Sequence, residues 1–158
     1  MKKTRYAIVG TGGRSTMYRD ALLKTFAETC ELVAACDINP LRARAWQADL
    51  DEKLPFYEPT RFKDMIREQR VDKVIVTSMD RTHDHYICAA MEAGCDVITE
   101  KPMTIDAKRC RRVLETQART GCDLAVTFNY RYSPRVSKVR ELLRDDAIGK
   151  FTSVHFEW

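Results

Sequence analysis

The stretch Gly10-Thr11-Gly12-Gly13-Arg14-Ser15 decides the fold of this chain. It follows the apolar run at residues 6–9 and precedes a helical pattern, so it predicts a strand, a glycine turn and a helix start. The outward-facing N–H groups of such a helix start attract anions, which is typical of a phosphate-binding loop. A serine stands where the third glycine of the G-x-G-x-x-G/A fingerprint is usual, and its small size still allows close packing. Because an ordinary turn gives a similar pattern, the motif needs support from the rest of the chain.

The composition bounds the class of protein. A chain of 158 residues suits one domain, or one domain and part of another, and 44% hydrophobic with 32% charged residues excludes disorder. The net charge of +4 is mild, and the basic run at residues 108–112 predicts a solvated helix face and no nucleic-acid partner. Six cysteines without C-x-x-C spacing indicate packed, reduced thiols and no metal site. Without a signal peptide or a run of transmembrane length, we expect a cytoplasmic protein without a membrane partner.

Strand patterns alternate with helical patterns along residues 5–128. Apolar runs predict strands at about 5–9, 32–36, 74–77, 96–99 and 124–128, and residues 54–59 form a proline-flanked connection. This order predicts an α/β fold with a doubly wound parallel sheet of the Rossmann type, whose strands all end at one edge. We expect a crevice there, lined by residues that follow the strands: Gly10, Asp37, Thr77, Glu100, Lys101 and Asn129.

The last thirty residues have a different pattern. Residues 129–131 form a polar loop, and Pro134 opens a further helix. Val154, Phe156 and Trp158 then alternate with polar residues, which predicts a strand buried on one face only. We therefore predict a cofactor-binding domain at residues 1–128. Residues 129–158 are expected to be the connecting helix and first strand of a truncated α+β substrate domain.

Asp37 ends the second predicted strand, 22 residues after Ser15. A carboxylate at this place accepts hydrogen bonds from both ribose hydroxyls of an adenosine and repels a 2′-phosphate. An ordinary turn aspartate is the alternative interpretation. Arg42 and Arg44 lie nearby and would tolerate a 2′-phosphate, so the residues predict NAD and leave NADP as an alternative.

Glu100-Lys101-Pro102 follows the fourth predicted strand at once. Lys101 at a crevice would hold a substrate hydroxyl or, with a lowered pKa, move a proton. The alternative is a surface ion pair between the two neighbours. Pro102 keeps Lys101 out of a helical conformation, which favours a fixed and functional placement.

The segment Thr82-His83-Asp84-His85 resembles a metal-binding pattern. Histidines two apart at a helix start point to different faces, so joint ligation of a metal is not expected. We interpret Thr82 as the helix cap. His83 falls on the inward stripe and is interpreted as a packing or pocket residue in preference to a catalytic base.

Four segments together resemble the glucose–fructose oxidoreductase, inositol dehydrogenase and rhizopine catabolism (Gfo/Idh/MocA) family. They are residues 7–12, residues 80–83 followed by 90–94, residues 97–103 with Glu-Lys-Pro, and residues 128–134. The resemblance covers the whole chain but only the amino-terminal half of a family member. Met79 stands where a proline is common, and Ser15 replaces a glycine or alanine.

The resemblance implies a Rossmann domain that binds NAD or NADP, followed by a sheet domain that holds a sugar, inositol or related polyol. It implies hydride transfer at a CH–OH group, with Lys101 as the active-site lysine and Asn129 near the nicotinamide. The cofactor-binding set expected on this basis is Gly10, Thr11, Gly12, Gly13, Arg14, Ser15, Asp37, Thr77, Ser78, His83, Glu100, Lys101 and Asn129. The acid–base pair of the family's second domain has no counterpart here, so we expect cofactor binding without turnover.

Three other functions fit parts of the pattern. A glycosidase of the same fold would use bound NAD for transient oxidation, and a non-catalytic regulator would use it as a signal. The glycine loop alone also suits S-adenosylmethionine, against which the Glu100-Lys101-Pro102 segment argues. For a full-length protein we expect a homo-oligomer acting on a small molecule.

Overall fold

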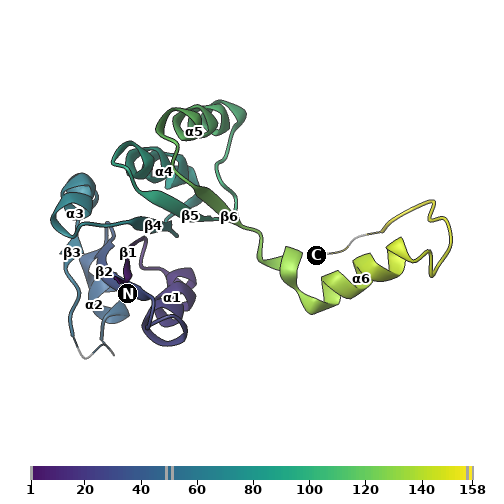
Figure 1. Ribbon diagram of the computed structural model, residues 1–158, viewed down its shortest axis with the longest axis horizontal. Helices are drawn as coiled ribbons and strands as arrows, with labels where there is room; N and C mark the ends of the chain where they lie inside the picture. Colours follow the sequence, from purple (N-terminus) through teal and green to yellow (C-terminus); the bar gives the residue numbers. More distant parts are fainter. Residues whose placement is uncertain (1, 49, 51, 156, 158) are drawn as a thin grey trace. The chain divides into compact units, whose positions relative to one another are not determined.

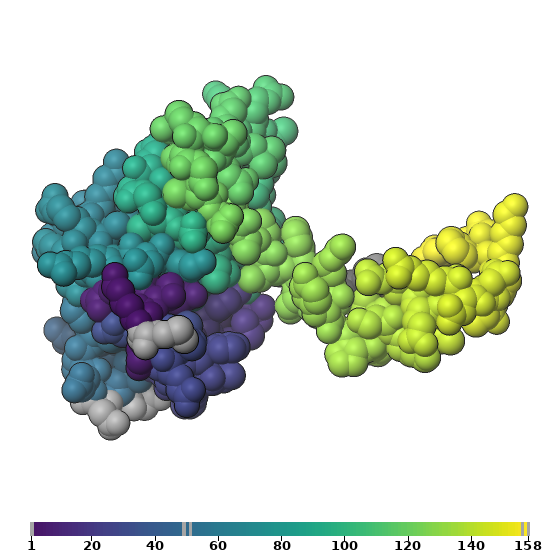
Figure 2. Space-filling model, in the orientation of Figure 1, coloured from purple at the N-terminus to yellow at the C-terminus, as the bar shows by residue number. Residues whose placement is uncertain are grey.

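The computed structural model describes residues 2–48, 50, 52–155 and 157. The chain divides into two compact units, Met1–Thr127 and Phe128–Trp158. Figure 2 draws the first unit in purple to green and the second in light green to yellow. No helix of the described residues is long and apolar enough to cross a membrane.

The first unit is a parallel sheet of six strands in the order β3-β2-β1-β4-β5-β6. The order of the strands in the chain reverses between β1 and β4, which is where open α/β sheets bind ligands. The five strands predicted from apolar runs are all present. The bounds are β1 Thr4–Val9, β2 Cys30–Cys36, β3 Phe56–Tyr57, β4 Lys73–Val76, β5 Asp96–Glu100 and β6 Leu124–Thr127.

Helices cover both faces of this sheet (Figure 1). Side chains of β1 point alternately to the two faces: Ala7 and Val9 pack into the hydrophobic cluster on one face, and Ile8 packs into the cluster on the other. The second cluster includes Leu22 and Trp46, whereas the first includes residues of α3, α4 and α5. The doubly wound fold expected from the sequence is confirmed. The helices are α1 Gly13–Asp20, α2 Pro40–Trp46, α3 Phe62–Glu68, α4 His83–Glu92 and α5 Ala107–Thr120.

Short helical turns complete the first unit: η1 Ala21–Thr25, η2 Pro59–Arg61 and η3 Asp80–Thr82. The turn η1 is a π-helical turn, closed by a 2.8 Å bond from the Phe26 N–H to the Ala21 carbonyl. Phe26, which follows this wider turn, is 54% exposed. The two-residue strand β3 lies inside the predicted connection at residues 54–59.

The second unit contains the turn η4, Asn129–Tyr132, and the helix α6, Pro134–Arg144. The strand predicted near the end of the chain is absent from residues 150–155 and 157. A strand needs a hydrogen-bonded neighbour, and none of the described residues of this unit provides one. Phe156 and Trp158, on which that prediction also rested, lie outside the described residues. The assignment of residues 129–158 to a substrate domain stays a prediction.

The cysteines and the basic run have structural roles. All six cysteines are free thiols, and Cys36, Cys88 and Cys95 are buried. Two side chains of the basic run, Arg109 and Arg112, form ion pairs of 3.0 and 3.1 Å with the buried carboxylate of Asp84. These pairs tie α5 to the start of α4, so the run is partly a packing feature and not simply a solvated face.

Candidate functional site

The glycine loop joins β1 to α1 beside the point where the strand order reverses. Gly10 has a φ of +90°, and a Cβ atom there would lie 2.5 Å from the Ser78 nitrogen and 2.6 Å from its Cα. Only glycine fits, because both neighbours are backbone atoms. The space over the next two glycines is open: a Cβ on Gly12 would meet only the Arg42 side chain, at 3.7 Å, and one on Gly13 would meet nothing within 4 Å.

The start of α1 suits an anion. Gly12 is the N-cap, no described side chain caps the helix, and its first turn contains no acidic residue. Unsatisfied N–H groups and the helix dipole therefore face the open space above the loop. Ser15 is completely buried, and its hydroxyl donates to the Gly12 carbonyl, so serine fits the place of the third fingerprint glycine. This arrangement fits the diphosphate of a dinucleotide.

Asp37 follows β2 and holds the glycine loop from one side. Its Oδ2 accepts hydrogen bonds from the Thr11 N–H at 2.6 Å and the Thr11 hydroxyl at 2.9 Å, and its Oδ1 accepts from the Asn39 N–H at 2.8 Å. A carboxylate has about four acceptor positions, so these bonds leave about one for a ligand. Binding both ribose hydroxyls would require a bond to Thr11 to open, and the ribose role of Asp37 stays a prediction.

The loop after β4 holds the glycine loop from the other side. The Thr77 hydroxyl donates to the Gly10 carbonyl at 2.7 Å, and the backbone of Ser78 lies against Gly10. Thr82 is the N-cap residue of α4, as interpreted from the sequence, but its side chain does not bond a helix amide. Its hydroxyl instead donates to the Met79 carbonyl at 2.7 Å and shares a 2.8 Å bond with the Ser78 hydroxyl. The tight turn η3 brings these groups closer than the helix amides.

Glu100 connects the end of β5 to α1. Its Oε1 accepts from Arg14 Nε at 2.5 Å and from the Tyr18 hydroxyl at 2.8 Å. The Tyr18 hydroxyl also lies 2.9 Å from the hydroxyl of Thr127 on β6. Burial alone would raise the pKa of Glu100, but the hydrogen bonds from Arg14 and Tyr18 outweigh it and hold that pKa below its ordinary value. Glu100 is therefore an anchored carboxylate.

Lys101 differs from its neighbour in exposure and in contacts. Its side chain is exposed, and among the described residues no ion pair or hydrogen bond holds its ammonium group. The surface ion pair between Glu100 and Lys101 is therefore absent, because the Glu100 carboxylate bonds Arg14 and Tyr18 instead. The Lys101–Pro102 peptide bond is cis. The ammonium is available to a ligand at the carboxyl edge of the sheet.

His83 is a buried residue, as its place on the inward stripe predicted. Its side chain lies between two backbone carbonyls, with Nδ1 2.8 Å from the Pro102 oxygen and Nε2 3.0 Å from the Ser78 oxygen. His85 is exposed and stacks edge-on near Tyr86, so the two histidines face different ways. Both ring nitrogens of His83 face protein carbonyls, and its place in the cofactor-binding set stays a prediction.

A cleft of about 400 Å³ runs from the glycine loop to α2. It is lined in part by Thr11, Gly12, Gly13, Thr16, Arg42 and Trp46. Arg19 also lines it, and its guanidinium lies 5.5 Å from the centre of the Trp46 ring.

The sequence interpretation named Arg42 only as a residue that would tolerate a 2′-phosphate, and it did not name Tyr18 as a site residue. Arg14 and Tyr18 lie one helical turn apart, and this spacing could have indicated that both side chains reach the same partner, Glu100.

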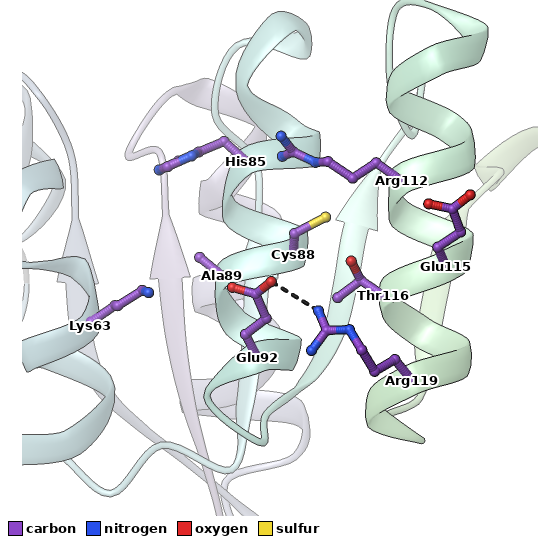
Figure 3. A pocket seen from close by; sticks show the side chains of 9 residues that line it. All are labelled: Lys63, His85, Cys88, Ala89, Glu92, Arg112, Glu115, Thr116 and Arg119. Atoms are coloured by element: carbon purple, nitrogen blue, oxygen red, sulfur yellow. Dashed lines mark hydrogen bonds and ion pairs between the residues drawn. The ribbon is translucent and has the colours of Figure 1, made fainter.

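A second cavity of about 420 Å³ lies between α4 and α5, away from the glycine loop (Figure 3). Both arginines that line it are in ion pairs: Arg119 bonds Glu92 at 3.0 Å, and Arg112 bonds Asp84. It contains none of the predicted site residues. The candidate site is therefore the carboxyl edge of the sheet. Asn129 belongs to the second unit, and its role stays a prediction.

Comparison with known proteins identifies the family. Residues 4–128 match the Gfo/Idh/MocA group, described as an oxidoreductase family with an NAD-binding Rossmann fold. The chain belongs to this family. Its first unit is thus an NAD-binding Rossmann domain, and the glycine loop has the geometry that such a domain needs.

The similar proteins are longer than this chain. YteT of Bacillus subtilis is 35% identical over 145 residues, which are 90% of this chain and 34% of YteT. Inositol 2-dehydrogenase/D-chiro-inositol 3-dehydrogenase of Lactiplantibacillus plantarum is 30% identical over 93% of this chain and 41% of its own length. The chain therefore spans less than half of these relatives.

Solved structures share the fold. Scyllo-inositol dehydrogenase from Lactobacillus casei, with bound NAD(H) and scyllo-inositol, aligns with a TM-score of 0.80 at 22% identity over 94% of this chain and 43% of that one. The WlbA dehydrogenase from Bordetella pertussis, in complex with NADH and UDP-GlcNAcA, aligns with a TM-score of 0.80 at 23% identity, over 94% and 44%.

Proposed function

We propose that this chain is the NAD(P)-binding part of an oxidoreductase acting on a CH–OH group of a sugar, inositol or related polyol. The observation that carries the proposal is the glycine loop, where open space over Gly12 and Gly13 faces the uncapped start of α1. The exposed ammonium of Lys101 follows β5 at the same edge of the sheet. The relatives of this chain include inositol dehydrogenases, which supports a polyol as substrate.

Each residue has a defined task in this proposal. The amides at the start of α1 bind the diphosphate, and Asp37 faces the adenosine ribose. Lys101 orients the substrate hydroxyl by donating a hydrogen bond and moves the proton that this hydroxyl loses. The nicotinamide cofactor, when bound, supplies the acceptor or donor of the hydride. Glu100 and Ser15 hold the geometry and do not meet the substrate.

The proposal gives the 158-residue chain cofactor binding with little or no turnover. The relatives are more than twice as long, and we place the substrate pocket in the sequence that they have in addition. The complete protein would be a cytoplasmic homo-oligomer. Robust oxidation of myo-inositol or a hexose by residues 1–158 alone would contradict the division of labour proposed here.

Titration with NADH, followed by its fluorescence, tests the cofactor site. Gly12→Asp places a carboxylate beside the diphosphate position, where only the flexible Arg42 side chain is near. We expect this charge to weaken NADH binding by about tenfold or more. Gly12→Asn is the matched control, because it has nearly the same shape without the charge.

The difference between these two variants measures the charge of the ligand at that point. If Asp and Asn weaken binding equally, no diphosphate lies over Gly12. If the wild-type chain does not bind NADH or NADPH at all, the proposed function is wrong. Unfolding curves of both variants show whether the fold is intact.

A further inference from the structure

His83 is a buried polar side chain for which the proposed hydride transfer has no use. It is 1% exposed and begins α4, directly after the loop that packs on Gly10. Both of its ring nitrogens face backbone carbonyl oxygens, those of Pro102 and Ser78. A buried imidazole enclosed between two carbonyl oxygens has little freedom to move, so it is fixed next to both of the backbone segments that it touches.

One of these segments belongs to the cofactor loop. The backbone of Ser78 lies against Gly10, and Thr77 donates to the Gly10 carbonyl at 2.7 Å. The other segment contains Pro102, which directly follows Lys101. The imidazole of His83 therefore lies between the backbone that packs on Gly10 and the turn that contains Lys101.

The chemistry of the partners fixes the position of a proton. Carbonyl oxygens only accept hydrogen bonds, so each ring nitrogen that bonds here must carry hydrogen. The neutral ring has one N–H, so it donates to only one of the two carbonyls. We assign this hydrogen to Nδ1, which lies 2.8 Å from the Pro102 oxygen.

We infer that His83 is a positioning residue for Lys101, acting through the Pro102 carbonyl. Glu100 is held from the α1 side by Arg14 and Tyr18, and Pro102 is held from the α4 side by His83. Lys101 lies between these two anchors, while its own ammonium is bonded to no described residue. The inference rests on the proposed function, in which this ammonium bonds the substrate hydroxyl and therefore lies near the nicotinamide that exchanges the hydride.

Binding of NAD⁺ and NADH by the 158-residue chain tests the inference. The two cofactors differ by a positive charge on the nicotinamide, so a nearby ammonium weakens NAD⁺ binding relative to NADH. We expect Lys101→Met to lower the ratio of Kd for NAD⁺ to Kd for NADH by about three- to tenfold. His83→Ala should lower the ratio similarly, and the double variant should lower it no further.

Two conservative variants separate positioning from simple packing. The amide nitrogen of Asn lies near the Nδ1 position of histidine, and that of Gln lies near the Nε2 position. His83→Asn retains the donor to Pro102 and should keep the wild-type ratio, whereas His83→Gln places its donor toward Ser78 instead and should behave like His83→Ala. A merely structural role would lower stability in all three variants and leave the ratio unchanged.

Several outcomes overturn the inference. It fails if the ratio responds to Lys101→Met but not to His83→Ala, and also if it responds to neither. The proposed function fails separately, through a wild-type chain that binds no NADH. Nitrogen-15 spectra of the wild-type ring need no variant. A protonated Nδ1 is expected, and an Nδ1 without hydrogen would remove the bond to Pro102 and with it the inference.

Discussion

The glycine loop after β1 and the Lys101 turn after β5 lie at the same sheet edge but differ in how tightly backbone atoms pack there. In the loop, the backbone of Ser78 fills the space where Gly10 would carry a side chain, in addition to the hydrogen bonds of Asp37 and Thr77. Hydrogen bonds hold the turn, through Glu100 on one side and His83 on the other. Gly10 therefore cannot accept an added atom, whereas the turn depends on the hydrogen bonds of Glu100 and His83.

Adding one methyl group to the loop should have the largest effect. Gly10→Ala would place Cβ 2.5 Å from the Ser78 nitrogen at a φ of +90°, so both overlap and backbone strain arise. We expect the free energy of unfolding to fall by about 3 kcal/mol or more, measured with urea. Gly94→Ala is the control, with a φ of +84° and nothing within 4 Å, and should cost about 1 kcal/mol. Equal losses would show that contact with Ser78 does not hold the loop.

Removing one charge from the turn should have a smaller effect, and one that depends on pH. Glu100→Gln weakens the bonds from Arg14 and Tyr18, and because Arg14 is 39% exposed, solvent screens part of the pair. We expect the free energy of unfolding at pH 7 to fall by about 1–2 kcal/mol. Urea unfolding at several pH values measures it.

The sign of the pH dependence follows from the direction of the shift. The pKa of Glu100 is lower in the folded chain than its ordinary value of 4.5. Its stabilisation is therefore present above that value and is lost as pH falls toward the lowered pKa. The gap between wild type and Glu100→Gln should narrow below pH 4.5. Glu92→Gln, in an exposed pair with Arg119, should show little gap at any pH. A gap that is constant across pH would mean that charge does not hold the turn.

The smallest expected effect concerns Arg42, which lies over the loop without taking part in its packing. Its side chain is exposed and lines the cleft beside Gly12, where a phosphate on the adenosine side would lie. Arg42→Ala should leave stability within about 0.5 kcal/mol of wild type. It should weaken NADPH binding by about fivefold more than NADH binding. Fluorescence titrations measure both.

Arg44→Ala is the matched control, because Arg44 is exposed on the same helix but does not line the cleft. It should leave both affinities unchanged. An equal loss for NADH and NADPH in Arg42→Ala would assign this side chain to the diphosphate instead. Arg42 would then contribute to the binding of both cofactors and not to the selection between NADH and NADPH.

The positions of most strands and of the loop were predictable from the sequence because both leave a local signature. Five apolar runs located five strands, and the glycine pattern at residues 10–15 located the phosphate loop. The strand β3 was missed, since two residues between prolines show no period. The turn η1 was missed because its residues, Ala21–Thr25, carry no local feature that distinguishes a wider hydrogen-bond ring from an α-helical one.

The bonds that hold the site together were beyond local patterns. Asp37 bonds Thr11 across 26 positions of the sequence, and Glu100 bonds Arg14 across 86. Which residues become partners depends on the order of the strands and on the rotation of each helix about its axis. The pattern of apolar and polar residues specifies both only coarsely. The sequence therefore indicated which residues gather at the edge, but not that several of them bond one another.

The contact between Gly10 and Ser78 also has a kinetic consequence. Two loops that touch through backbone atoms support each other, so the diphosphate of the dinucleotide meets a glycine loop that is already formed. Little conformational entropy is then lost on association, and no slow rearrangement has to precede it. The approach of NADH should follow a single exponential whose rate rises in proportion to its concentration.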